Sequence, residues 1–463
     1  MGSKATTSPP KGTRDFLPDD LRRRRFVTEL IREVYEAHGF APLETPSFER
    51  LETLLGKYGD EGDQLVFKIL HRGQPLVRGI REAAAHLEEP AHVIVGRSGE
   101  TAPGAERLLA DLGLRYDLTV PLARVYAAYG GKLPPVFRRY QIQPVWRADN
   151  PGKGRFREFF QCDVDVVGAA GPAVEAEVVG AVSTCLDRLG FSDCTLRLNH
   201  RGLLRALIEV AGIPAERETE AIVALDKLDK LAPDAVRAEM ADKGIETEAA
   251  ARLLDAVLGE PTLDRMTGVL GEHEAGRQAC QELARVQALV ARTPGAGKLV
   301  FSPTLARGLG YYTGAIFEIA HPDLSGSLGG GGRYDGLIGM FSGRDVPACG
   351  FSLGLERILV VMEQRGMFPD LAASADVLVG YADPAREADA VELAYRLRAE
   401  GLSVELHPKK DKPGRLKKQA MERGFRGLVT VPVEGEPQLW RPDRPDDPAG
   451  PLPTPAAPAL RGG

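Results

Sequence analysis

Several features that mark particular classes of protein are missing from this sequence. No apolar run reaches about 18 residues, so no membrane-spanning helix is expected. The first residues, up to Pro18, contain no apolar signal region, so secretion is not expected either. The 463 residues include five cysteines, which are widely spread and form no C-x-x-C pair. They argue against a zinc cluster or a disulfide framework, and for reduced thiols in a cytoplasm.

Two common nucleotide-binding signatures are also missing. The Walker sequence G-x-x-x-x-G-K-[ST] does not occur, so an ATP site would not be of the P-loop type. The stretch LARGLGYYTGAIFEI, residues 305–319, contains three glycines, but the third glycine of the dinucleotide fingerprint would fall at Thr313. Its two adjacent tyrosines are a poor choice for a bare turn. We therefore expect a ligand close to this backbone, with Arg307 and Tyr312 facing it.

The net charge is negative, but positive charge is concentrated in one segment. The net charge of −6 does not suggest a protein whose whole surface binds nucleic acid. Residues 409–426, however, carry eight Lys or Arg against Asp411 and Glu422, which leaves a local charge of +6. Such a run is more often a solvated helix face than a phosphate-contacting patch, and on charge alone we favour the solvated face.

Hydrophobic periodicity indicates several parts. Helix is predicted at 20–38 and over most of 203–294, and strands at 136–168 and 298–319. Residues 73–112 form a loosely patterned insertion for which no firm structure is predicted. From Asp376, strands and helices alternate as a βαβαβ unit with a parallel sheet. The tail from Arg441 has seven prolines and is predicted to be disordered.

A long antiparallel hairpin is predicted around a turn-rich, basic loop. Read in steps of two, its polar face carries Arg139, Gln141, Gln143, Val145 and Arg147 on one strand, and Arg157, Phe159, Gln161, Asp163 and Asp165 on the other. The opposite face is apolar and is expected to pack on the core. The arginines of the hairpin and its loop can donate to phosphate oxygens; they are Arg147, Arg155 and Arg157. Asp165 and Gln161 can accept hydrogen bonds from a cationic or amide-like ligand. An ordinary solvated face is the alternative, and spacing alone does not decide between them.

Arg357 adds weight to the ligand hypothesis. It lies in the first turn of a helix predicted to follow Gly350 and Gly354. A helix start favours anions, so an arginine there works against the helix dipole and calls for a partner anion.

Taken together, these segments resemble the histidyl-tRNA synthetases, a family of class II aminoacyl-tRNA synthetases. The motifs that carry the resemblance are RYDLTVPLAR, RYQIQPVWRADNPGKGRFREFFQCDVDVVG, LARGLGYYTGAIFEI, GGGGRYDGL and GFSLGLERI. KGTRDFLP near the start and TPSFERLETLLGKYG, which is similar to the family's dimer-interface motif, extend the match. The resemblance covers residues 11–435 with gaps.

The resemblance implies an α+β fold with three domains. The catalytic domain, an antiparallel sheet of about six or seven strands flanked by helices, would comprise residues 1–200 and 298–370. A helical insertion would occupy 203–294, and an α/β anticodon-binding domain 375–440, followed by the tail 441–463. The implied activity uses ATP and Mg²⁺ to activate L-histidine as histidyl-adenylate, and then transfers histidine to the 3′ end of tRNA(His). A cytoplasmic homodimer with its interface near residues 43–56 is also implied.

The resemblance further implies roles for individual residues. Arg147 would contact the α-phosphate of ATP, Arg357 the γ-phosphate and Arg155 the phosphates, while Arg307 would span the histidine carboxylate and the α-phosphate. Asp117, Thr119 and Gln161 would hold the substrate amino group, and Asp165 and Tyr312 would read the imidazole. The glycines 329–332 with Arg333 and Tyr334 would line the pocket, which only one of the two tyrosines, Tyr312, would enter. The tRNA contacts would come from Lys409, Lys410, Lys412, Arg415, Lys417 and Lys418, and no metal-ligating side chains are expected.

Some positions depart from the family pattern. Gly310 replaces a polar residue expected before the tyrosines, and Asn150 and Gly152 replace residues of the acceptor-facing loop. The proline-rich tail stands where a final helix and strand are expected, so the last domain appears shortened. One rival hypothesis is a catalytically inactive paralogue that acts as a regulator or sensor, against which the presence of Arg307 and residues 375–435 counts. A plain nucleic-acid-binding module is the other, but it would not need Arg147, Arg307, Arg357 and Asp165 together.

Overall fold

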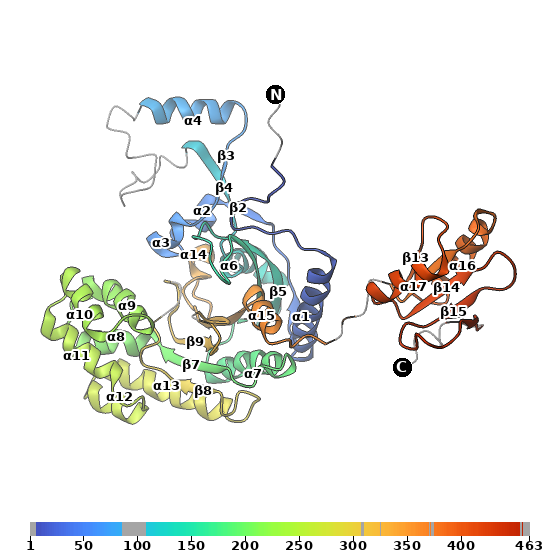
Figure 1. The fold of residues 1–463 in the computed structure, drawn as a ribbon. Coiled ribbons are helices and arrows are strands. Elements are labelled where there is room, and N and C mark those ends of the chain that lie inside the picture. Colours follow the sequence, from blue (N-terminus) through green and yellow to red (C-terminus); the bar gives the residue numbers. More distant parts are fainter. Residues whose placement is uncertain are drawn as a thin grey trace. The chain divides into compact units, whose positions relative to one another are not determined.

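The computed structural model describes residues 6–85, 108–306, 310–324, 326–369, 371, 375–453 and 456 (Figure 1). The chain divides into two compact units, one of residues 1–16 and 24–367 and one of residues 17–23 and 368–463. Among the described residues, none of the helices has the length and apolar character needed to span a membrane.

An eight-stranded sheet forms the centre of the first unit. Its order is β1 (Ala41–Pro42), β5 (Phe137–Trp146), β6 (Glu158–Val167), β11 (Ala348–Gly354), β10 (Gly329–Arg333), β9 (Ala315–Ala320), β7 (Thr195–His200) and β8 (Leu299–Phe301). The six inner strands, from β5 to β7, are antiparallel. The short edge strands β1 and β8 pair in parallel. The predicted antiparallel catalytic sheet is therefore confirmed, with two parallel edge strands added.

The predicted hairpin is the β5–β6 pair, in the register that alternation requires. Arg139 lies opposite Asp165, Gln141 opposite Asp163, and Gln143 opposite Gln161. Four of these side chains, those of Arg139, Gln141, Asp163 and Asp165, are at most 2% exposed. The polar face of the hairpin is therefore buried, and the solvated-face alternative is wrong.

Helices cover the opposite, apolar face of the hairpin. Cys162, Val164 and Val166 of β6 are fully buried there. Helices α7 (Pro172–Arg188) and α15 (Leu355–Gln364) pack against β6. From α1 (Pro18–Ala37), Tyr35 donates its hydroxyl hydrogen to the carbonyl of Cys162 at 3.3 Å. This packing fixes the orientation of β6, and with it the direction in which the polar face points.

A second, three-stranded sheet is formed by β2 (Phe48–Arg50), β4 (Ala110–Leu114) and β3 (Lys68–Leu70). Short helices α2 (Leu51–Leu54) and α3 (Gly59–Gln64) lie between β2 and β3 in the chain, and α6 (Thr119–Tyr129) follows β4. The insertion without predicted structure contains α4 (Gln74–Ala85) and β4, and its residues 86–107 lie outside the described part of the chain.

The chain between β7 and β8 is helical, in the segment where the periodicity predicted helices. It forms α8 (Arg201–Val210), α9 (Glu218–Leu225), α10 (Pro233–Asp242), α11 (Thr247–Leu258), α12 (Leu263–Leu270) and α13 (Glu274–Val290), which gather into one cluster in Figure 1. Helix α13 packs on both α7 and α8, and so connects this cluster to the central sheet.

The second unit contains a five-stranded sheet. Its order is β13 (Val404–Leu406), β12 (Val377–Tyr381), β14 (Gly427–Val431), β15 (Gln438–Trp440) and β16 (Gly450–Pro451), with α16 (Glu387–Ala399) and α17 (Pro413–Glu422) in the connections. The pairs β12–β13 and β12–β14 are parallel, as the βαβαβ pattern predicted. Two buried clusters, one built with α16 residues and one with α17 residues, hold the unit together.

The prediction of disorder from Arg441 does not hold for residues 441–453. Strand β16 pairs antiparallel with β15, and the amide of Leu452 donates to the carbonyl of Pro437 at 3.0 Å. Trp440 is 4% exposed and donates its indole N–H to the carbonyl of Pro445 at 3.4 Å. Prolines are tolerated on an edge strand, where no further ladder partner is needed. Residues 454–455 and 457–463 of the tail lie outside the described part.

Candidate active site

A cavity of about 560 Å³ opens on the buried polar face of the central sheet. This size suits a small-molecule ligand. The residues with predicted roles that line it are Asp117, Thr119, Arg147, Arg155, Gln161, Asp165, Tyr312 and Arg357. Strands and loops far apart in the sequence thus bring eight predicted residues to one place. Arg307, the remaining residue predicted for this site, lies outside the described residues.

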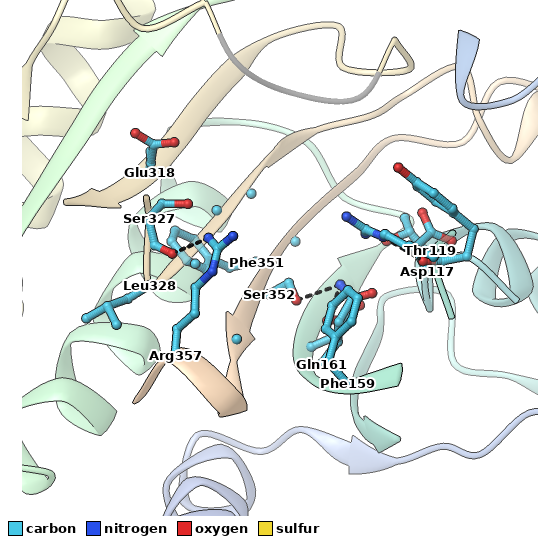
Figure 2. A pocket seen from close by; sticks show the side chains of 18 of the residues that line it. Asp117, Thr119, Phe159, Gln161, Glu318, Ser327, Leu328, Phe351, Ser352 and Arg357 are labelled. Carbon is cyan, nitrogen blue, oxygen red and sulfur yellow. Dashed lines mark hydrogen bonds between the residues drawn. The ribbon is translucent and has the colours of Figure 1, made fainter. Parts of the chain in front are cut away.

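The two ends of the cavity differ in chemistry. Figure 2 shows Arg357, Ser327 and Glu318 at one end and Asp117 and Thr119 at the other. Between them, Gln161 donates from Nε2 to the hydroxyl of Ser352 at 2.7 Å (Figure 2).

Backbone carbonyls and aromatic rings position the guanidinium groups. Arg357 donates from Nη1 to the carbonyl of Ser327 at 2.5 Å and from Nε to that of Gly154 at 3.4 Å. Arg147 donates from Nε to the carbonyl of Tyr116 at 3.0 Å. Its guanidinium also lies 4.2 Å from the centre of the Tyr116 ring. Arg147 uses one of its five donors in the bond to Tyr116, so its cationic end can also contact an anion.

Asp117 is held by three donors. Oδ1 accepts from the hydroxyl of Tyr58 and from the amide of Val120, and Oδ2 accepts from the hydroxyl of Tyr311, each at 3.1 Å. Burial raises the pKa of Asp117, whereas these hydrogen bonds and the nearby Arg147 lower it.

The prediction that only one tyrosine enters the pocket is wrong. Tyr311 and Tyr312 both line the cavity, with their rings 5.1 Å apart in an edge-to-face arrangement. The prediction assumed strand alternation from Tyr312 onward, but β9 begins only at Ala315. The two tyrosines lie in a turn ahead of that strand, where alternation does not apply.

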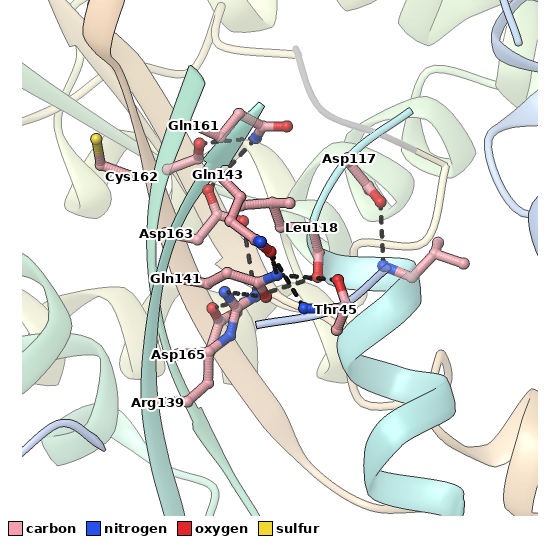
Figure 3. Close-up of polar contacts among 12 residues, drawn as sticks. Thr45, Asp117, Leu118, Arg139, Gln141, Gln143, Gln161, Cys162, Asp163 and Asp165 are labelled. Atoms are coloured by element: carbon pink, nitrogen blue, oxygen red, sulfur yellow. Dashed lines mark hydrogen bonds and ion pairs between the residues drawn. The ribbon is translucent and has the colours of Figure 1, made fainter. Parts of the chain in front are cut away.

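Arg139 occupies the deepest part of the polar face and was not predicted as a site residue. Its Nη2 lies 2.9 Å from Oδ2 of Asp165 and 3.6 Å from Oδ2 of Asp163 (Figure 3). The hydroxyl of Tyr334 donates to Oδ1 of Asp165. The pKa of Asp163 is raised to about 7. Burial is the main cause, Arg139 acts in the opposite direction, and Asp165 raises the pKa further. Burial also raises the pKa of Asp165.

Arg333 does not line the cavity, contrary to the prediction, although Tyr334 does. Its Nε donates to Oε1 of the fully buried Glu175 on α7 at 2.8 Å. Adjacent residues at the end of a strand point to opposite faces, so only one of the two can reach the cavity.

Glycines let strands β10 and β11 approach the carboxylates closely. A Cβ on Gly350 would lie 1.9 Å from Oδ1 of Asp165, and one on Gly331 would lie 2.1 Å from the carbonyl oxygen of Gly350. Any larger residue would therefore collide with the wall of the cavity. This is the physical reason for the glycine run before Arg333.

The N-terminal segment holds the hairpin loop beside the cavity. The amide of Arg157 donates to the carbonyl of Gly12 at 2.7 Å, and the guanidinium of Arg14 lies 3.5 Å from the centre of the Phe156 ring. Arg157 itself donates from Nε to the carbonyl of Asp149 at 3.1 Å, and it is not among the cavity-lining residues. The sequence suggested a phosphate contact for Arg157; its position instead supports the loop that carries Arg155.

Glu356 also links several elements at this end. Its Oε2 accepts from the amide of Phe160 at 2.9 Å, and its Oε1 accepts from Arg24 at 3.0 Å. Glu356 is 3% exposed, lines the cavity and directly precedes Arg357. Sequence reasoning missed it because a carboxylate in the first turn of a helix is common and needs no special role.

The six basic residues predicted to contact tRNA lie in the second unit, in the loop before α17 and on that helix. Lys409, Lys410, Lys412, Arg415 and Lys418 are exposed. Lys417 is half-buried, and its Nζ lies 4.8 Å from the centre of the Trp440 ring. Two of the charges have acidic neighbours, since Arg415 lies 3.3 Å from Asp411 and Lys418 lies 3.7 Å from Glu422.

Comparison with known proteins gives consistent results. The family model described as histidyl-tRNA synthetase matches residues 12–81 and 108–358. A relative from Gloeobacter violaceus named histidine–tRNA ligase is 41% identical over 447 residues, covering 91% of this chain and 90% of the relative. A relative of the same name from Leifsonia xyli subsp. xyli is 40% identical, covering 92% and 96%.

Solved structures show the same fold. The crystal structure of histidyl-tRNA synthetase from Nostoc sp. PCC 7120 has a TM-score of 0.76 and 26% identity, with 99% of each chain covered. A Bacillus halodurans C structure described as an ATP phosphoribosyltransferase regulatory subunit/histidyl-tRNA synthetase has a TM-score of 0.70. At 23% identity, over 93% of this chain and 100% of that one, this second likeness shows the fold alone.

The raised pKa of Asp163 predicts a pH-dependent effect of its replacement. Because the native pKa of about 7 lies above the value of about 3.9 for an unfolded aspartate, the folded state retains a proton that the unfolded state releases. Stability therefore falls as pH rises through this window. Asp163→Asn should raise the thermal unfolding midpoint of the ligand-free protein more at pH 8 than at pH 5.

The matched control is Asp193→Asn, because hydrogen bonding from Arg365 lowers the pKa of Asp193. Stability from a lowered pKa is present above the unfolded value, so this replacement should give no gain at either pH. An equal shift for Asp163→Asn at both pH values would contradict the prediction.

Proposed function

Because this chain belongs to the histidyl-tRNA synthetase family, we propose that its cavity binds L-histidine and ATP side by side and activates the histidine. The activity of the chain is that of a histidine–tRNA ligase. The proposal concerns which residues perform it. The observation that carries it is the convergence, in a single cavity, of the acceptors of Asp117, Gln161 and Asp165 with the guanidinium groups of Arg147, Arg155 and Arg357.

Two buried acceptor atoms indicate where histidine binds. Oε1 of Gln161 and Oδ2 of Asp165 are buried and accept no hydrogen bond from the described residues. Unfilled buried acceptors are costly unless a ligand supplies the donors. The ammonium group and an imidazole N–H of histidine are such donors. We assign the ammonium to Gln161, Asp117 and Thr119, and the imidazole to Asp165 and Tyr312.

We assign the triphosphate to the part of the cavity between Arg147, which is close to Asp117, and Arg357, which lies at the opposite end. Arg147 is assigned to the α-phosphate, Arg357 to the γ-phosphate and Arg155, which also lines the cavity, to the phosphates. Arg155 is 54% exposed and lies 3.8 Å from Asp149, so it can move toward a bound phosphate. Arg307 is assigned to the histidine carboxylate and the α-phosphate on the sequence motif alone.

The chemistry follows from the charges. A carboxylate oxygen of histidine forms a bond to the α-phosphorus while the bond to the pyrophosphate oxygen breaks. Both reactants are anionic, so fixed cations are needed to bring them together. Arg147 supplies one, held by Tyr116, and the enzyme forms no covalent intermediate. In the second step the aminoacyl group passes from AMP to the terminal ribose of tRNA.

Magnesium is proposed as a companion of ATP. Among the described residues, no group of three His, Cys, Asp or Glu side chains is arranged to hold a metal. Mg²⁺ commonly binds through one or two carboxylates together with substrate phosphates and water. Glu318 meets this need, because it is 5% exposed and lies with Ser327 and Arg357 at the phosphate end (Figure 2). Bound there, Mg²⁺ would neutralise phosphate charge.

The regulatory alternative gains no support. The Bacillus halodurans C structure shares the fold at an identity too low to transfer a function. The unfilled acceptors of Gln161 and Asp165 fit a substrate, and the relatives named histidine–tRNA ligase cover more than nine-tenths of the chain. We also propose a cytoplasmic location, which the five free, buried cysteines support.

We propose a homodimer with the interface near residues 43–56. Phe48 of β2 is 52% exposed and Leu70 of the same small sheet is 58% exposed, and both are large apolar side chains. Sedimentation of the wild-type protein at micromolar concentration should therefore give twice the chain mass of 50.0 kDa. A single 50.0 kDa species would disprove the dimer.

Replacing the arginines at the reacting centre should abolish most adenylate formation. Arg147→Ala and Arg307→Ala should each lower the rate of histidine-dependent exchange between ATP and pyrophosphate by about 10²–10³-fold, because each removes a preorganised charge. The control is Arg138→Ala, which removes an arginine of β5 that pairs with Glu177 outside the cavity, whereas Arg147 directly follows that strand. A loss of less than about tenfold with unchanged thermal unfolding would show that the assigned role is wrong.

The basic residues of the second unit should affect tRNA alone. Replacing Lys409, Lys410, Lys412, Arg415, Lys417 and Lys418 by glutamine should raise the KM for tRNA and flatten its dependence on salt, since phosphate contacts release counterions. Exchange between ATP and pyrophosphate should stay near the wild-type rate because it needs no tRNA. Equal loss in both assays would indicate a folding role, and unchanged charging would indicate a solvated surface.

A further inference from the structure

At the end of the cavity assigned to histidine, buried carboxylates outnumber buried guanidinium groups. Three carboxylates, those of Asp117, Asp163 and Asp165, are each at most 2% exposed. Asp117 is satisfied by two tyrosine hydroxyls and a backbone amide, as described above. Asp163 and Asp165 share one cationic partner, the guanidinium of Arg139, which is 0% exposed.

Arg139 is fixed by more than its two carboxylates. Nη1 donates to Oε1 of Gln141 at 3.2 Å, and Nη2 donates to the carbonyl of Leu118 at 3.3 Å. Gln141 donates in turn to Thr45 Oγ1 at 3.0 Å and to Gln143 Oε1 at 2.6 Å (Figure 3). The guanidinium is thus at the end of a chain of amide and hydroxyl contacts that limits its movement.

Asp165 is held from two sides. The hydroxyl of Tyr334 donates to Oδ1, while Nη2 of Arg139 lies 2.9 Å from Oδ2. Although that contact is close, Oδ2 accepts no hydrogen bond with acceptable geometry from the described residues. Arg139 therefore supplies charge and position to Oδ2 and leaves its lone pairs for another donor.

Asp163 lies on the other side of the same guanidinium. Its Oδ2 is 3.6 Å from Nη2 of Arg139, and its Oδ1 accepts from Gln161 at a long 3.4 Å. It also lines the cavity, beside Gln161 and Asp165 on the same face of β6. A side-chain hydrogen bond with Ser352 also holds it. Burial of its charge is nevertheless costly, so this aspartate adds little to the stability of the fold.

We propose that Arg139 and Asp163 are positioning residues for histidine recognition: Asp163 fixes Arg139 from one side, and Arg139 holds Asp165 with Oδ2 facing the imidazole N–H. This inference rests on the proposed assignment of Asp165 to the imidazole. It adds that the affinity for histidine depends on two buried charged residues, Arg139 and Asp163, which act by positioning Asp165.

The proposal separates binding of histidine from binding of ATP. The pair lies against Asp165. Arg357 lies at the end of the cavity opposite Asp117 (Figure 2). Loss of the pair should therefore raise the KM for histidine and leave the KM for ATP nearly unchanged. A role in folding alone would alter the amount of active enzyme and hence the apparent kcat, without this separation.

The test is exchange between ATP and pyrophosphate in four variants of the full chain: Asp163→Asn, Arg139→Lys, Arg139→Met and the double variant Arg139→Met/Asp163→Asn. Asp163→Asn is expected to raise the KM for histidine about tenfold, because a misplaced charge-assisted hydrogen bond costs roughly that factor. The KM for ATP and kcat should stay within about twofold. Arg139→Met should raise the KM for histidine further, and Arg139→Lys should restore part of it.

The double variant shows whether the two residues act together. If Asp163 acts through Arg139, Asp163→Asn should have little further effect on the KM for histidine in the Arg139→Met background. If Arg139→Met does not fold, the same comparison is made with Arg139→Lys, which keeps the charge but changes the geometry. Independent effects in both backgrounds would overturn the proposal, as would an unchanged KM for histidine in Asp163→Asn.

The matched control is Arg138→Met. Arg138 is the next residue on β5, but its guanidinium pairs with Glu177 at 3.0 Å, and neither residue lines the cavity. It should leave both KM values unchanged. Absence of histidine-dependent exchange in the wild-type protein would contradict the proposed function itself, whereas normal wild-type exchange with unaffected variants would contradict only the positioning role.

Discussion

The site depends on the burial of the polar face of β5 and β6. Transferring a carboxylate or a guanidinium out of water is expensive unless hydrogen bonds or opposite charges replace the lost solvent. On this face the replacement is nearly complete: Arg139 serves two carboxylates, and amide side chains link it to Thr45. The acceptors that remain unfilled are Gln161 Oε1 and Asp165 Oδ2, and both border the cavity. Under the proposed assignment, the donors of histidine complete this face.

Strands β10 and β11 of the central sheet lie unusually close to each other and to this face. Strand β11 reaches Asp165 because Gly350 has no side chain, and β10 reaches β11 because Gly331 has none. The close approach brings the hydroxyl of Tyr334 to Asp165 and that of Ser352 to Gln161. A sheet with ordinary side chains at these positions would fill the cavity or force the strands apart. The glycines therefore give the site both its space and two of its hydrogen-bond partners.

Much of this arrangement was predictable from the sequence, because alternation along β5 and β6 fixes which residues share a face. The register of Arg139 with Asp165 and of Gln141 with Asp163 follows from it directly. Prediction failed for Tyr311 and Tyr312, which precede β9 and both line the cavity because alternation does not apply there. It also failed for Arg333, because alternation between Arg333 and Tyr334 was not considered and Arg333 instead pairs with Glu175 on α7. Contacts such as Gly12 with Arg157 join distant segments, and no local pattern encodes them.

Local composition misled the prediction for the proline-rich tail in the same way. Proline argues against helices and central strands, but it does not exclude an edge strand that uses only one side for pairing. Strand β16 is such an edge, and Trp440 beside it contacts both Pro445 and the basic helix through Lys417. The segment that seemed to shorten the second unit instead completes its sheet.

Stability and recognition place opposite demands on Asp163. Its burial beside Asp165 raises its pKa to about 7, so the folded chain would be more stable with a neutral residue there. The contact with Arg139 gives the charge a proposed use, because Asp163 at 3.6 Å and Asp165 at 2.9 Å attract the guanidinium from two sides and limit its movement. Under the proposed assignment, histidine supplies the donors that Gln161 and Asp165 lack, so binding offsets part of the free energy lost to burial.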